Sequence, residues 1–153
     1  MLDRTNTWLS VVEVAAIVVS LIIVANEFRQ NTEATVGQTE QGLLELLAAQ
    51  DAWMLDSDFA AVVVKAEQAE EPLSTVESHQ YTSWMTGRLN ICEHVFNRHV
   101  IDLVSDDVWQ AWDAGCGAMA GVPAVEQVWQ EQRPYYGPGF VRYFDERIAA
   151  ASP

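Results

Sequence analysis

Residues 8–25 read WLSVVEVAAIVVSLIIVA, an apolar run of eighteen residues with one charged side chain, Glu13. As an α-helix the run would be about 27 Å long, close to the ~30 Å hydrocarbon thickness of a bilayer. β-Branched residues surround this helix, and Trp8 stands where an interfacial aromatic residue belongs. The basic start and small-x-small site of a cleaved signal peptide are lacking. We therefore expect an uncleaved transmembrane helix rather than the core helix of a soluble protein.

Glu13 needs an explanation, because an ionised carboxylate that faces lipid costs several kcal/mol. Ser10, Ala16 and Ser20 lie at helical spacing from it, and Ala16 and Ser20 form a small-xxx-small pair that lets helices approach closely. Three interpretations stay open: Glu13 bonds to a partner helix, it snorkels without a role, or a ring of Glu13 carboxylates lines a cation path. The first predicts a homo-oligomer or a partner membrane subunit.

The charge balance limits the possible partners. The chain has 22 acidic residues against 8 Lys and Arg, a formal net charge of -14 that repels nucleic-acid phosphates. We expect the lipid bilayer as a partner and no nucleic acid. Orientation is not decided by charge, because Arg4 flanks one end of the apolar run and Arg29 the other.

The two cysteines, Cys92 and Cys116, fit no zinc-binding spacing, and we interpret them as buried thiols. A disulfide between them would need an oxidising compartment, which the sequence does not establish. Free thiols and the missing secretory signal favour a domain on the cytoplasmic side of the membrane.

The rest of the chain is predicted to be helical throughout. Residues 26–56 lack proline and should continue the membrane helix as a stalk, with a packing face that includes Leu43, Leu44 and Leu47 and possible bends at Gly37 and Gly42. Capping and breaking residues then predict five helices, over residues 58–70, 74–103, 105–119, 123–132 and 140–149. Ser74 and Glu77 form a capping box at the start of the second of them, and Ser105-Asp106-Asp107 should cap the third.

The fold class that follows is all-α. We expect one N-terminal transmembrane helix that continues into a long stalk helix and packs with about five further helices as a small helical bundle. The expected organisation is a flank at 1–7, a transmembrane helix at 8–25, a stalk at 26–56 and a soluble helical domain at 57–150.

One cluster has residue types suited to chemistry: Cys92-Glu93-His94, followed by Asn97-Arg98-His99, with His79 upstream. It contains no HxxxH or ExxH pair, so a second helix would have to complete a metal site. The cysteines lie within packed helices rather than on exposed turns, which disfavours a nucleophile. No phosphate-binding glycine loop is present. We therefore expect no catalytic residues, no metal and no cofactor.

Two stretches stand out as a pair. The first is Asn26-Glu27-Phe28-Arg29-Gln30-Asn31-Thr32-Glu33 after the apolar run, and the second runs from Val128 to Arg133 and from Gly137 to Asp145. In this order and spacing they resemble a widespread family of uncharacterised bacterial single-pass membrane proteins. The match spans nearly the whole chain, and Pro134-Tyr135-Tyr136 departs from the family pattern. The resemblance implies a single-pass protein of the bacterial inner membrane and implies no activity.

Together these features predict a membrane-anchored structural or scaffold protein that self-associates or serves as an accessory subunit of a larger membrane complex. Two alternatives stay open. One is a homo-oligomeric cation channel with Glu13 lining the pore, and the other is a membrane-tethered metal-dependent enzyme.

Overall fold

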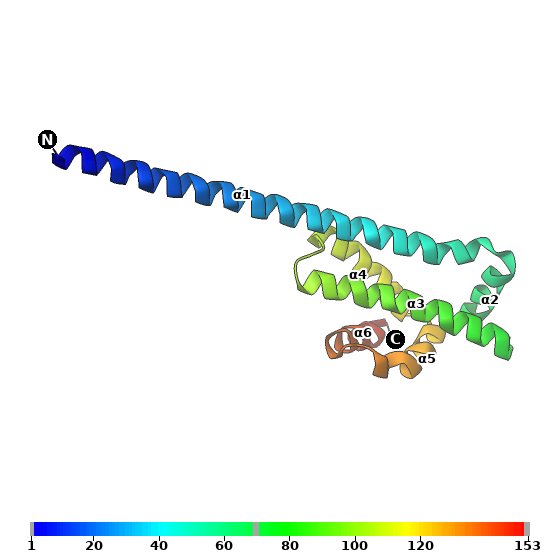
Figure 1. Ribbon diagram of the computed structural model, residues 1–153. Helices are drawn as coiled ribbons and strands as arrows, with labels where there is room; N and C mark the ends of the chain where they lie inside the picture. The colour runs from blue at the N-terminus through cyan, green and yellow to red at the C-terminus, as the bar shows by residue number, and fades with distance from the viewer. Residues whose placement is uncertain (1, 69–70, 152–153) are drawn as a thin grey trace. The chain divides into compact units, whose positions relative to one another are not determined.

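The computed structural model describes the backbone of residues 2–68 and 71–151, and the side chains of these ranges from Val12 onward. All the regular structure in these ranges is helical, which confirms the all-α prediction (Figure 1). The chain divides into two compact units, Met1–Gln38 and Thr39–Pro153. We call them the N-terminal unit and the C-terminal unit and describe each by itself.

The N-terminal unit is the first part of helix α1, whose bounds are Leu2–Asp51. Side chains from Val12 to Ala34 are exposed, and hydroxyls among them bond to their own helix: Ser20 Oγ donates to the Ala16 carbonyl at 2.8 Å. Among the described residues no helix is long and apolar enough to cross a membrane. The span predicted at 8–25 begins at Trp8, and the side chains of residues 8–11 lie outside the described ones.

The C-terminal unit contains the end of α1 and all later helices. After α1 come η1 (Ala52–Leu55), α2 (Ser57–Gln68), α3 (Thr75–Val100), α4 (Asp106–Ala120), α5 (Pro123–Gln132), η2 (Arg133–Tyr135) and α6 (Pro138–Ala151). The five helices predicted after the stalk are therefore present, and α1 continues through Gly37 and Gly42 without a break. Helix α3 packs against α2, α4, α5 and α6 and is the centre of the bundle.

A capping box starts helix α3, as the sequence predicts. Ser74 Oγ accepts from the Glu77 amide at 3.3 Å, and Glu77 Oε2 accepts from the Ser74 amide at 2.6 Å. Lys65 of α2 also donates to Glu77 Oε2 at 3.1 Å, so the cap joins two helices.

The start of α4 differs from the expectation that a Ser105 side chain would cap it. The helix begins at Asp106, but Ser105 makes no side-chain cap. Its Oγ donates instead to Glu40 Oε1 of α1 at 2.7 Å, and its amide donates to the same oxygen at 3.2 Å. The hydroxyl thus fastens α1 to the beginning of α4, a contact between residues 65 positions apart that local sequence rules do not reveal.

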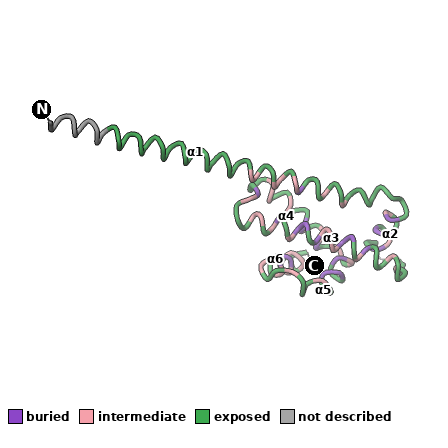
Figure 2. The backbone as a smooth tube through the Cα atoms, in the orientation of Figure 1, coloured by how far each residue is buried: buried purple, intermediate pink, exposed green. Residues whose placement is uncertain are grey.

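The core has two parts, and the buried residues from α2 to α6 mark it in Figure 2. The larger part centres on Trp129, Phe140 and Phe144, which are fully buried and whose rings contact one another. The smaller part joins α1 to α3 and to the segment before α4, through Leu43, Ile91, Val95 and Val104.

Candidate functional site

The residues predicted for the membrane helix share one face of the N-terminal unit. Glu13, Ala16 and Ser20 follow one another at spacings of three and four and are exposed, whereas the side chain of Ser10 lies outside the described residues. Ten large apolar residues between Val12 and Phe28 surround the same helix and are 44–69% exposed. This surface is a candidate contact for an apolar environment.

The three stalk leucines have different surroundings in the C-terminal unit. Leu43 is 1% exposed and packs inside the molecule, against the smaller core. Leu44 is 63% exposed and Leu47 is half-buried, and both line a pocket between α1, α3 and α4. The stalk face is therefore partly a core contact and partly the wall of a cavity.

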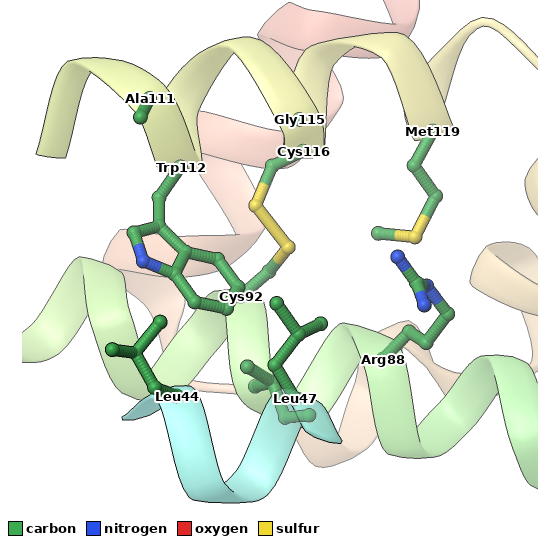
Figure 3. Close-up of a pocket in the computed structure, with 10 residues that line it drawn as sticks. Leu44, Leu47, Arg88, Cys92, Ala111, Trp112, Gly115, Cys116 and Met119 are labelled. Carbon is green, nitrogen blue, oxygen red and sulfur yellow. A yellow bond between two sulfur atoms is a disulfide. The ribbon is translucent and has the colours of Figure 1, made fainter. Parts of the chain in front are cut away.

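This pocket is a candidate binding site of the C-terminal unit. Its volume is about 310 Å³, and its walls are apolar apart from Arg88. Figure 3 shows Leu44 and Leu47 on one side, with Trp112 and the Cys92–Cys116 disulfide next to each other opposite them. The full lining is Leu44, Leu47, Arg88, Ile91, Cys92, Ala111, Trp112, Gly115, Cys116 and Met119.

The pocket walls are held in place at the end of α1. Gln50 Nε2 donates to the Trp84 carbonyl at 2.7 Å, and Trp84 Nε1 donates to the Gln50 carbonyl at 3.4 Å. Arg88 Nη1 donates to Asp51 Oδ1 at 2.9 Å. Gly87 permits this close approach, because a Cβ there would lie 2.7 Å from Gln50 Nε2.

Cys92 and Cys116 form a disulfide, which corrects the interpretation of two buried thiols. Their Cα atoms lie 6.2 Å apart, within the normal range for a disulfide, because α3 and α4 pack side by side. Both cysteines line the pocket, and Cys92 and Cys116 are 5% and 2% exposed. Neither sulfur is a free nucleophile, and the cysteines no longer favour a cytoplasmic domain.

The cluster around Cys92 does not converge on one point. Glu93 Oε1 accepts from the Gly137 amide at 2.8 Å and so fixes the turn before α6. The ring of His99 stacks on Trp109 with centroids 4.5 Å apart. Partial desolvation and the charge of Arg98 lower the pKa of His94. In the part of the chain that the structure describes, no three His, Cys, Asp or Glu side chains are grouped to hold a metal ion.

The tail residues that carry the family resemblance meet in a contact between α5, η2 and α6. The buried Trp129 donates from Nε1 to Asp145 Oδ1 at 2.8 Å, and Arg133 Nη2 lies 2.6 Å from Asp145 Oδ2. Hydrogen bonds from Arg133 and then Trp129 hold the pKa of Asp145 below its usual value against partial desolvation. Trp129, Arg133 and Asp145 therefore hold α5, η2 and α6 together.

Arg88, Trp112, Gly115 and Met119 line the pocket but were not among the predicted site residues. Trp112, Gly115 and Met119 recur at spacings of three and four on α4, which could have indicated one helix face. The sequence does not reveal that α1 stands opposite this face.

No protein family, curated protein or solved structure matches this chain. The resemblance to bacterial single-pass membrane proteins therefore stays a prediction, and a function has to be argued from the residues themselves.

Proposed function

We propose that this chain is a membrane-anchored scaffold protein, in which residues 8–25 attach a helical domain to the bilayer. The observation that carries the proposal is the apolar surface around the N-terminal unit, where ten large apolar side chains are 44–69% exposed. A helix that is apolar all round is stable in an apolar environment rather than in water. A bilayer supplies this environment.

A structural role agrees with how the C-terminal unit uses its polar side chains. Asp113 of α4 accepts from Tyr143 Oη at 2.7 Å and pairs with Arg147, and both partners belong to α6. Asp145 and Glu93 likewise join separate segments. These groups hold helices together, so the unit is best explained as a rigid module presented at a membrane.

The proposed partner is a second membrane helix, from another copy or from an accessory subunit. Glu13, Ala16 and Ser20 form the face that would contact it, since small residues permit close approach and a carboxyl group can bond across the interface. The cation-channel alternative requires Glu13 carboxylates to converge on one axis. Ion flux into liposomes separates the two: a scaffold conducts nothing, and a pore loses cation preference in Glu13→Gln.

The disulfide supports a placement of the C-terminal unit on the outer side of the inner membrane. Disulfides persist in oxidising compartments, and the bacterial periplasm is one. This proposal replaces the cytoplasmic expectation, which depended on free thiols and on the missing secretory signal; the disulfide removes the first of these two grounds.

Anchoring is tested by membrane pelleting and alkaline carbonate extraction of the untagged full chain from a bacterial host. The wild type should stay in the pellet. Val18→Arg combined with Leu21→Arg should release it, because each arginine at a helix centre costs about 3 kcal/mol of insertion free energy. The matched control, Val64→Arg with Val76→Arg, changes two exposed valines of the C-terminal unit and should stay in the pellet. Wild-type protein in the supernatant would refute the proposal.

The side of the membrane is tested on Lys65, the single lysine of the sequence. A membrane-impermeant amine reagent should label Lys65 in intact spheroplasts as fully as in lysed ones. Labelling that needs lysis would place the unit in the cytoplasm and contradict the proposed orientation.

A further inference from the structure

We propose that the pocket between α1, α3 and α4 binds a fatty acid, with the acyl chain inside and the carboxylate at Arg88. The inference concerns residues 44–119 and does not depend on the anchor proposed above. It assigns a ligand class to a cavity that the scaffold role leaves unused.

The interior of the pocket suits a flexible apolar chain. Its walls come from leucine, isoleucine, tryptophan and methionine side chains and from the disulfide, and its volume of about 310 Å³ is at the lower limit for small-molecule sites. Nine of the ten lining residues carry no charge. Burial of methylene groups against such walls is favourable, whereas a polar ligand would lose its hydration without gaining partners.

Arg88 supplies the single charge of the lining. Figure 3 shows its guanidinium at one end of the cavity, beside Met119 and away from Trp112. Its Nη1 bonds to Asp51, and its Cζ lies 5.2 Å from the Trp84 ring centroid, so the group is held in position. A guanidinium has five N–H donors, and those not used by Asp51 can bind a carboxylate. The side chain is 32% exposed, so a ligand can reach it.

This cation stands out in an acidic chain with 8 Lys and Arg and a net charge of -14. Three other cations, Lys65, Arg133 and Arg147, pair with carboxylates that join secondary-structure elements away from this pocket. A negative ligand would be repelled over most of the molecule, and at Arg88 it could bind through the guanidinium N–H groups that Asp51 leaves unused. One cation at the end of an apolar cavity is complementary to a monocarboxylate with an apolar tail, and this charge pattern favours a fatty acid over an uncharged partner helix.

The test is photocrosslinking of the purified full chain in phosphatidylcholine nanodiscs, with a fatty acid that carries a diazirine near the end of its chain. After irradiation and proteolysis, adducts should map to residues 44–47 and 111–119 and should be competed by the unlabelled fatty acid. If the wild type is found in the supernatant and not in the membrane pellet, the same crosslinking experiment is done in buffer. A wrong anchor proposal and a wrong ligand proposal therefore give different results.

Gly115 provides a blocking variant that should fold. Gly115 lines the pocket, and a Cβ there would meet no atom within 4 Å, so the backbone at this position accepts a side chain and Gly115→Leu adds bulk to the lining. Leucine also has a higher helix propensity than glycine. Capture should fall about tenfold or more, because the loss of two buried methylene groups already changes affinity by that factor. Ala118→Leu, on an exposed position of the same helix outside the lining, should leave capture unchanged.

Arg88→Gln tests the head group. It should reduce capture of the fatty acid, whereas capture of the matching fatty-alcohol probe should change little. The proposal is overturned if adducts appear only in residues 8–25, if Gly115→Leu captures as much as the wild type, or if Arg88→Gln affects acid and alcohol equally. Crosslinking of a second protein chain to residues 111–119 in place of the fatty acid would assign the groove to a partner helix and also overturn it.

Discussion

The disulfide between α3 and α4 allows a quantitative prediction. Cys92 and Cys116 are 24 positions apart, so the bond closes a loop of about 25 residues. In the chain-entropy description, removal of such a cross-link lowers the free energy of unfolding by about 3.5 kcal/mol at 25 °C. Small domains are stable by about 5–15 kcal/mol, so the double variant Cys92→Ala with Cys116→Ala should lose a large share of its stability.

The measurement is urea unfolding of the full chain in nanodiscs, followed by tryptophan fluorescence. Trp129 and Trp84 are buried in the C-terminal unit and report its unfolding. Addition of a phosphine reductant should shift the wild type towards the double variant and should leave the double variant unchanged, which controls for other effects of the reagent.

Two results would refute this reasoning. One is the detection of free thiols by thiol reagents after the non-reduced protein has been unfolded, because the disulfide would then be absent. The other is a difference of less than about 1 kcal/mol between the oxidised wild type and the double variant, since the loop-closure entropy predicts a change several times larger.

Two further predictions concern the capping box and the anchor. Backbone and side-chain hydrogen bonds from Ser74 lower the pKa of Glu77 from 4.5 to about 2, so this carboxylate stabilises the fold above pH 4.5 and loses the effect as the pH falls towards 2. The difference in unfolding free energy between wild type and Glu77→Gln should shrink over that range, and a pH-independent difference would contradict the assignment. On the anchor, Ala16→Leu with Ser20→Leu should weaken association more than Glu13→Leu, because bulk blocks close packing while one interhelical hydrogen bond contributes under ~1 kcal/mol. The association is measured by crosslinking in native membranes and by native mass measurement. A wild type that is monomeric and has no co-purifying subunit would contradict the prediction that this helix associates with another.

Local sequence signals predicted the helices well, because each signal acts within a few residues. The capping box at Ser74 and Glu77 marks the start of α3, and the helix predicted at 123–132 has those bounds in the structure. The last helix begins two residues before the prediction, at Pro138, whose fixed φ suits the first turn.

Non-local contacts could not be predicted in the same way. Leu43 and Leu44 are adjacent and chemically identical, yet Leu43 is 1% and Leu44 63% exposed, because only the packing of α3 against α1 distinguishes them. The disulfide depends on the pairing of α3 with α4, which the spacing of Cys92 and Cys116 does not encode. The pocket was missed for the same reason, since its walls come from three helices.

The residues that look chemically active in the sequence are mostly the ones that connect helices. The whole chain has a formal net charge of -14 and repels itself, so its few cations are most useful where each neutralises an acid on another segment. Arg133, Arg147 and Lys65 follow this rule. Arg88 follows it as well through Asp51, and it also lines the apolar pocket between α1, α3 and α4. Because its position serves both the stalk and the cavity, Arg88 is the residue at which a structural role and a ligand-binding role can be separated by experiment.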